Sequence, residues 1–274
     1  MKSLEPIITA HLFPQLDEQL VVLLRSLNAD EWNAPTIVPN WRVKDIAAHL
    51  LDTALRRLSL ARDGYFAEAP TDGDFVGFIN RLNHEGVTVY RRLSPSVLIA
   101  LMEVATRECA EHFASLNPFG KAVFAVSWAG ESESLNWFDI AREFTERWHH
   151  QQQIRLAVNR EGIMTREFYF PVLDAFMRAL PFHYRNVTAV SGTLLRFDVT
   201  GEGGGSWTLF REGEQWRLIK DASENLVAHI TIPPEIAWRI FTKGLSQEAA
   251  RAQTHCTGDE ALGLQVLRML SIVG

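Results

Sequence analysis

The hydrophobic pattern of the chain changes its period near residue 185, and this change constrains the fold more than any other feature. From about residue 6 to 183, apolar residues recur three and four positions apart, which is the spacing of amphipathic helices. Beyond it, short segments alternate apolar and polar residues, as half-buried strands do. The sequence therefore predicts a helical domain over residues 1–185, followed by a smaller antiparallel α+β domain over residues 186–274.

Capping and turn residues separate the helices expected in the first part. Asn40 has the character of an N-cap, Asp72 or Asp74 opens the next helix, and Ser94 followed by Pro95 begins another. The stretch over residues 122–136 has a mixed hydrophobic pattern. The expected helices cover residues 16–27, 41–58, 75–93, 94–116, 137–158 and 166–180.

Glycine-rich turns join the alternating segments of the second part. The run Gly201–Gly205 lacks the Lys-Ser/Thr of a phosphate-binding loop and joins two strands, so a hairpin turn is expected there. Pro233 and Pro234 open a helix to Phe241, and Asp259 caps a last helix to Leu270. The expected strands cover residues 193–199, 207–210, 216–219 and 227–232.

Composition limits the classes of protein and partner. The 274 residues suit one large or two ordinary domains, and a formal charge of −6 gives no reason to expect nucleic acid or an anionic membrane. Cys109 and Cys256 are the only cysteines and have no pairing or zinc-ribbon spacing, which favours a reducing compartment. There is no signal-peptide core and no apolar run long enough for a membrane span, so a cytoplasmic protein is expected.

Glu146 and His150 are the strongest candidates for chemistry, because they lie four residues apart in a helical run and share one helix face. A carboxylate and an imidazole so placed can bind one metal ion, and His49 could supply a third ligand from a second helix. Two alternatives remain open: the Glu–His pair as a surface interaction, and His49 as a core histidine. His149 points about 100° away from His150, so we expect it to be solvent-exposed or to lie behind the ligands.

Nucleophilic catalysis by a side chain is not supported. There is no G-x-S-x-G motif, and Cys109 has no base near it in the sequence. The remaining histidines show no partner spacing and are expected to be structural or exposed; they are His11, His84, His112, His183, His229 and His255.

Three segments together resemble the mycothiol-dependent maleylpyruvate isomerase family, part of the wider DinB-like group. The first is residues 31–50, with Trp-Arg-Val-Lys-Asp-Ile-Ala-Ala-His-Leu at its end; the second is Glu-Arg-Trp-His-His-Gln-Gln-Gln-Ile-Arg at 146–155. The third, Thr-Gly-Asp-Glu-Ala-Leu at 257–262, is similar to the sterol-carrier-like domain of these proteins.

The resemblance implies an N-terminal DinB-like four-helix bundle, a C-terminal sterol-carrier-like domain, and zinc held by His49, Glu146 and His150. The sequence departs from the family in two places. Gln153 stands where the family usually has Asp before Ile-Arg, which keeps the hydrogen bonds but loses the charge. Residues 78–85 are more like uncharacterised members of the group than like the isomerase.

The implied chemistry is activation of a small-molecule thiol, mycothiol or another, at an open zinc position, for isomerisation of or transfer to an electrophilic substrate. Recognition of a dicarboxylate would need arginines, for which Arg81 and Arg239 are the candidates. A non-catalytic binding module with a structural or vacant metal site, and a metal-dependent hydrolase, are the alternatives. The oligomeric state stays open.

Overall fold

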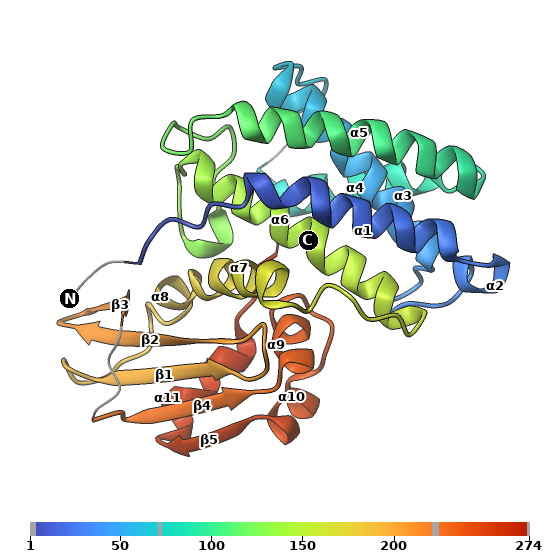
Figure 1. Ribbon diagram of the computed structural model, residues 1–274. Coiled ribbons are helices and arrows are strands. Elements are labelled where there is room, and N and C mark those ends of the chain that lie inside the picture. Colours follow the sequence, from blue (N-terminus) through green and yellow to red (C-terminus); the bar gives the residue numbers. More distant parts are fainter. Residues whose placement is uncertain (1–3, 71–72, 221–224, 273–274) are drawn as a thin grey trace.

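The computed structural model describes residues 4–70, 73–220 and 225–272. A bundle of helices lies above a five-stranded sheet that carries its own short helices (Figure 1). This arrangement confirms the expected class, a helical part followed by an α+β part. In the described part of the chain, no helix is both long enough and apolar enough to cross a membrane.

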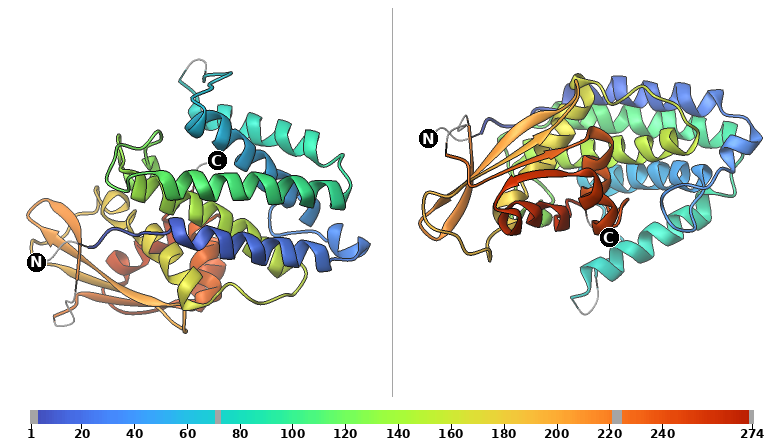
Figure 2. Two further views of the ribbon diagram at one scale, coloured as in Figure 1. Left: turned by 45° about the horizontal axis from the view of Figure 1, so that its top comes forward. Right: turned by 90° about the horizontal axis from the view of Figure 1, so that it is seen from below.

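Four helices form a closed ring, in which α1 and α3 each contact both α5 and α6. Each of them buries an apolar stripe in the common core, such as Leu16, Leu20 and Leu24 on α1. The helix α4 lies outside this ring, packed on α3 and diverging from the bundle (Figure 2). The bounds are α1 (Phe13–Ser26), α3 (Val43–Arg57), α4 (Phe75–Tyr90), α5 (Pro95–Ser115) and α6 (Asn136–Ala157).

The caps agree with the sequence except at one helix. Asp74 accepts a hydrogen bond from the Gly77 amide and caps α4, and Ser94 caps α5; Asp72 lies outside the described residues. Asn40 is not the cap of α3. It adopts a left-handed φ of 65° in the preceding turn, and the helix begins later, where the Asp45 carboxylate accepts from the Arg42 amide at 2.9 Å.

Shorter elements connect the bundle helices and lead to the sheet. The stretch expected to be mixed contains only a 3-10 turn and an isolated bridge. These elements are η1 (Ala10–Leu12), α2 (Ala29–Trp32), the π-helical turn η2 (Leu58–Arg62), η3 (Ser127–Ala129), α7 (Arg166–Met177) and α8 (Leu180–His183).

The sheet has the order β3-β2-β1-β4-β5. All four expected strands are present, and the Gly201–Gly205 turn joins an antiparallel pair as predicted. The expectation of a wholly antiparallel sheet is wrong, since β1 and β4 pair in parallel. Alternation reveals a strand but not its neighbour, and β4 pairs with a strand that does not precede it directly. The strands are β1 (Leu194–Val199), β2 (Gly205–Glu212), β3 (Gln215–Ile219), β4 (Ala228–Ile232) and β5 (His255–Gly258), the last of which was not predicted.

Asp259 caps α11 through the Leu262 amide, as expected. The helix is short, and a 3-10 segment continues the turn. The helices α7, α8 and α11 contact β2, β3 and β4 respectively. The remaining elements are α9 (Pro234–Phe241), α10 (Gln247–Gln253), α11 (Glu260–Gly263) and η4 (Leu264–Arg268).

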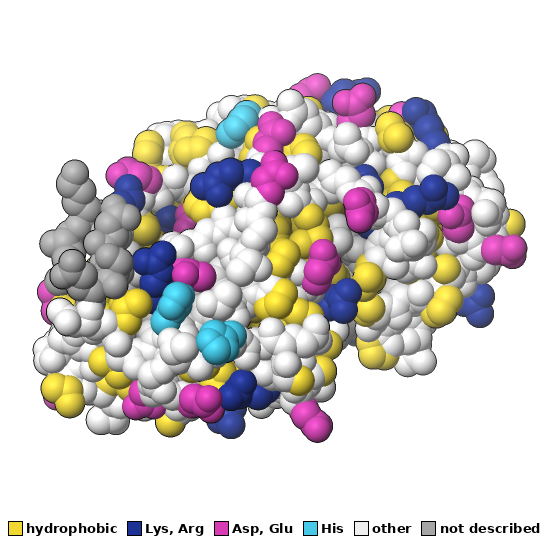
Figure 3. Space-filling view, turned by 60° about the horizontal axis from the view of Figure 1, so that its bottom comes forward, with side chains coloured by type: hydrophobic (Ala, Val, Ile, Leu, Met, Phe, Trp, Pro, Cys, Tyr) yellow, Lys and Arg dark blue, Asp and Glu magenta, His cyan; other side chains and the backbone are white. Residues whose placement is uncertain are grey.

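The helix α7 joins the two parts of the molecule. Tyr169 stacks on Trp148 of α6, with ring centroids 4.8 Å apart, and its hydroxyl donates to the Pro234 carbonyl at 2.7 Å. Asp174 accepts from the Trp207 indole of β2 at 2.8 Å. One continuous cluster of buried apolar residues therefore runs from the bundle through α7 to the sheet, and the domain boundary at residue 185 stays a prediction. On the face drawn in Figure 3, acidic and basic side chains are interspersed, and neither sign forms a continuous patch.

Candidate metal centre

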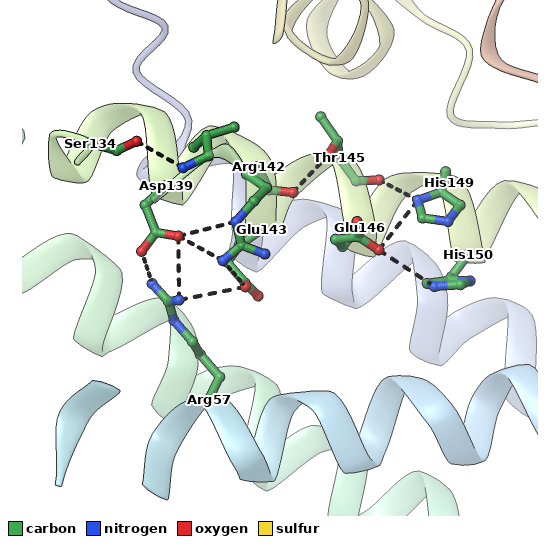
Figure 4. Close-up of polar contacts among 10 residues, drawn as sticks. Arg57, Ser134, Asp139, Arg142, Glu143, Thr145, Glu146, His149 and His150 are labelled. Atoms are coloured by element: carbon green, nitrogen blue, oxygen red, sulfur yellow. Dashed lines mark hydrogen bonds and ion pairs between the residues drawn. The ribbon is translucent and has the colours of Figure 1, made fainter. Parts of the chain in front are cut away.

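The helix α6 places Glu146 and His150 on one face, as their spacing requires. The Oε2 atom of Glu146 lies 3.7 Å from Nε2 of His150, and the two side chains turn toward each other (Figure 4). The helix is central in the bundle, and most of its side chains over these turns are buried, polar ones included. The pair is therefore not the surface interaction that the sequence left open as an alternative.

Of the two positions expected for His149, the solvent-exposed one is wrong. Its side chain is buried rather than exposed, at 1% of its full accessible surface. Its Nδ1 lies 2.9 Å from the Thr145 carbonyl, and because a carbonyl can only accept, this nitrogen carries the proton. Glu146, His149 and His150 each offer a ligand atom, and these atoms all lie within 4.8 Å of one another. The 100° separation along the helix does not hold the two imidazoles apart, since their ring centroids are 4.0 Å apart.

His49 reaches the same place from α3. Its ring centroid lies 4.6 Å from that of His150 and 5.2 Å from that of Trp41. It does not belong to the tighter group of Glu146, His149 and His150. Its Nδ1 is buried and has no hydrogen-bond partner among the described residues. A buried imidazole nitrogen without a partner costs free energy, so this atom fits a site whose ligand completes it.

Gln153 takes the orienting position that the sequence suggested. Its Oε1 accepts a hydrogen bond from His150 Nδ1 at 2.9 Å. The proton is then fixed on Nδ1, and the lone pair of His150 lies on Nε2, the nitrogen that faces Glu146. The Gln amide thus supplies the hydrogen bond that a carboxylate at this position would supply.

Burial sets the protonation of the imidazoles. It lowers the pKa of His150 to about 3, with the neighbouring His149 adding to the effect, and the pKa of His149 to about 4. Burial also lowers the pKa of His49 well below its usual value, and repulsion from a protonated His150 and from the Arg56 guanidinium acts in the same direction. All three rings are neutral at pH 7 and offer a lone pair. Burial raises the pKa of Glu146, against the lowering effect of His150.

A cavity of about 380 Å³ opens beside these residues, between α3, α4, α6 and the segment after α9. Arg81 and Arg239 do not line it: Arg81 pairs with Glu68 and Glu85 on the outer surface, and the basic lining side chain is Lys243. The lining residues are Ile37, Val38, Pro39, Trp41, His49, Asn80, Asn83, His84, Glu146, His149, His150, Gln153, Thr242, Lys243, Gly244 and Ile272.

The contribution of α4 to the cavity wall was not predicted from the sequence. Asn80, Asn83 and His84 are spaced three and four residues apart and line the cavity together. This spacing is visible in the sequence, but nothing local indicates that α4 faces the metal-binding helices. His84 is exposed, as expected, yet it belongs to the cavity.

A second polar group lies earlier on α6 and consists of side chains that pair with one another. Asp139 receives hydrogen bonds from Arg57 of α3 and from Arg142, and Arg142 also pairs with Glu143 at 2.8 Å (Figure 4). This ion network ties α3 to α6 within the bundle. The part of α6 that faces the cavity is the later part, which carries Glu146.

Comparison with known proteins identifies a family for the helical part of the chain. The family described as the mycothiol maleylpyruvate isomerase N-terminal domain matches residues 13–155, more than half of the chain. No curated protein matches the sequence. A crystal structure of a histidine-to-alanine mutant of the mycothiol-dependent maleylpyruvate isomerase resembles this fold with a TM-score of 0.50 and 13% identity, over 84% of this chain and 86% of that one.

A second crystal structure of the mycothiol-dependent maleylpyruvate isomerase has a TM-score of 0.48 and 12% identity over the same shares of both chains. At such identity the first likeness shows the fold alone. The family match covers α3 and, up to Arg155, α6, the two helices that carry the candidate metal ligands. The chain therefore belongs to the mycothiol maleylpyruvate isomerase N-terminal domain family.

Proposed function

We propose that this chain is a zinc-dependent enzyme that uses a low-molecular-weight thiol, as the mycothiol-dependent maleylpyruvate isomerase does by name, on a small electrophilic substrate. His49, Glu146 and His150 would hold the metal. One observation carries the proposal: two neutral imidazoles and a carboxylate, from two helices, meet at the wall of a cavity large enough for a small molecule.

The donor set fits zinc. Imidazole nitrogens and a carboxylate oxygen are common zinc ligands, and a site with three protein ligands keeps a position open for chemistry. Neutral rings need not lose a proton before binding the ion. The buried and unpaired Nδ1 of His49 supports its assignment as the third ligand.

When bound, zinc would stabilise the thiolate form of a coordinated thiol at neutral pH. The chain's own residues prepare the site for that role. Gln153 fixes the His150 ring so that Nε2 faces the site. Ile37, Val38 and Trp41 add apolar surface to the cavity lining, which makes the cavity less favourable for water. Isomerisation and transfer of the thiol to the substrate are both compatible with this arrangement.

The metal content of the purified, untagged protein tests the proposal. We expect about one zinc per chain by mass spectrometry, and loss of that zinc in His150→Ala and His49→Ala. His149→Ala is the matched control, because it removes a neighbouring imidazole. If His149→Ala loses the metal and His49→Ala keeps it, the third ligand is His149.

Activity is measured next, with mycothiol and maleylpyruvate on the zinc-loaded protein. Thiol-dependent turnover that disappears in His150→Ala supports the enzyme. A chain that takes up no metal from supplied zinc would instead be a non-catalytic binding module. A chain that binds zinc and hydrolyses esters without any thiol would be a hydrolase.

A further inference from the structure

The face of α3 that carries His49 continues into a charged network one and two turns later. Arg56 donates from Nε to Oδ2 of Asp52 at 2.8 Å, and from Nη2 to Oδ1 of Asn83 on α4 at 2.7 Å. The Arg56 and Asp52 side chains keep only 24% and 11% of their surface exposed. The helices approach closely here, because a Cβ atom at Gly86 would lie 2.2 Å from the Asp52 carboxyl carbon.

This network fixes the orientation of the Asn83 amide. A guanidinium only donates, so the atom of Asn83 that it contacts must be the amide oxygen. The amide nitrogen, with its two protons, is left for another partner. Asn83 lines the cavity, so its amide nitrogen can donate to a ligand bound there.

The neighbouring residues of the cavity wall are also polar or basic. Asn80 and His84 lie on the same face of α4, and Lys243 lines the cavity from the C-terminal part. Among the described lining residues, the only carboxylate is that of Glu146, which belongs to the metal centre. Away from the metal centre, the described lining therefore suits a ligand group rich in oxygen acceptors, of which a carboxylate is the strongest.

We propose that Asn83, oriented by Arg56, is a specificity-determining residue that donates a hydrogen bond to a carboxylate oxygen of the substrate. Arg56 is a positioning residue that acts through Asn83. The proposal rests on the proposed function, because it assigns the substrate side of the same cavity.

The variant Asn83→Asp separates a ligand contact from a structural role. An aspartate at this position keeps its oxygen for Arg56 and strengthens that pair, so the network persists. It removes the amide donor and places a negative charge toward the ligand. We expect maleate, used as a cis-dicarboxylate probe in isothermal titration, to bind at least about tenfold more weakly than to wild type, with an unchanged or higher melting temperature.

A charge-matched control is Val89→Asp, on the same helix. Val89 is 53% exposed and does not line the cavity. We expect this variant to bind maleate like wild type. Equal weakening by both variants would show a general effect of charge and would overturn the proposal, as would wild-type affinity in Asn83→Asp.

Arg56→Met tests the positioning role by selectivity. Without Arg56, the Asn83 amide is free to rotate and offer either its oxygen or its nitrogen. We expect the ratio of maleate affinity to maleamide affinity to fall severalfold, a change that loss of stability alone would not produce. An unchanged ratio would remove Arg56 from the proposal.

All titrations are run with and without zinc, and the zinc content of each sample is measured. If no zinc binds but Asn83→Asp still weakens maleate binding, the assignment of Asn83 stands and the metal-dependent function fails. If zinc binds and wild type shows no affinity for maleate in either state, the assignment of Asn83 fails and the metal centre stands.

Discussion

At the scale of single residues, the proposed metal centre depends on where each imidazole proton lies. The proton on His150 Nδ1 is fixed by Gln153, and the one on His149 Nδ1 by the Thr145 carbonyl. The spacing of Glu146 and His150 could be read from the sequence, because an i, i+4 relation is local. The burial of His149 could not, since it depends on elements packed around α6 rather than on neighbours in the chain.

Gln153→Leu keeps the size of the side chain but removes the acceptor of the His150 proton. We expect zinc affinity to fall by about tenfold or more, as it does when an outer hydrogen bond to a ligand histidine is lost. Competition with a chromophoric chelator measures this. Gln153→Glu is the matched control and should retain the affinity; equal loss in both variants would contradict the orienting role.

We expect the buried histidines to make the fold sensitive to acid when no metal is bound. The folded-state pKa values of His149 and His150 are about 4 and about 3, below the ordinary value of 6.5. Between pH 6.5 and 4 the unfolded chain binds more protons than the folded one, so stability falls as the pH is lowered through this window. The raised pKa of Glu146 acts in the opposite direction.

We therefore expect the melting temperature of zinc-free protein to fall from pH 6.5 to pH 4, and more steeply than that of His149→Gln/His150→Gln. Differential scanning calorimetry across this range is the measurement. Parallel curves for the two proteins would mean that these imidazoles are solvated or already charged.

The two thiols should differ in reactivity. Cys109 is fully buried, donates toward the Ala54 carbonyl at 3.4 Å, and burial raises its pKa to about 11. Cys256 is partly exposed. At pH 8 we expect one thiol per chain to react with Ellman's reagent in the native state and a second only after unfolding. Rapid reaction of both would contradict the packing around Cys109.

At the scale of elements, helices that bury a regular apolar stripe were predicted to within a few residues. The start of α3 was placed too early, because Asn40 has the side chain of a cap but sits in a left-handed turn, which the Trp41 amide closes by donating to the Val38 carbonyl. The strand β5 was missed because its four residues show no apolar alternation. The wall formed by α4 depends on the angle between helices, which no sequence period encodes.

The crossing of α3 and α4 depends on Gly86. Alanine would favour the helix by about 1 kcal/mol, but its Cβ would overlap the Asp52 carboxylate, which Arg56 holds. We expect Gly86→Ala to lower the free energy of unfolding despite its better helix propensity. A double-mutant cycle with Asp52→Ala, measured by urea denaturation, should show relief of the overlap; additive effects would contradict it.

At the scale of the whole molecule, the two parts share a core. Trp148 of α6, Tyr169 of α7 and Trp238 of α9 pack ring to ring across the sequence-predicted boundary. The change of hydrophobic period near residue 185 correctly marks where helices give way to strands. It does not reveal that α7 packs against both the bundle and the sheet. The hydrophobic period shows which residues of a helix are buried, but it does not show which element covers them.

We expect the full chain to unfold in a single calorimetric transition, since separating the two parts would expose the shared aromatic cluster. The fragment over residues 1–185 should lack a cooperative transition and bind a hydrophobic dye. Two resolved transitions in the full chain, or a fragment that melts cooperatively, would show that the parts are independent domains.

Because α7 packs against both the bundle and the sheet, its position also affects the order in which the protein folds during synthesis. This helix leaves the ribosome before the strands that cover it, so Tyr169 and the facing side of α6 stay open while the rest is made. The parallel pairing of β1 with β4 delays closure further, because β4 comes after two intervening strands. The last third of the chain must therefore be synthesised before the first two thirds can finish folding. A chain interrupted before β4 leaves apolar surface of α6 and α7 exposed and is therefore prone to aggregate.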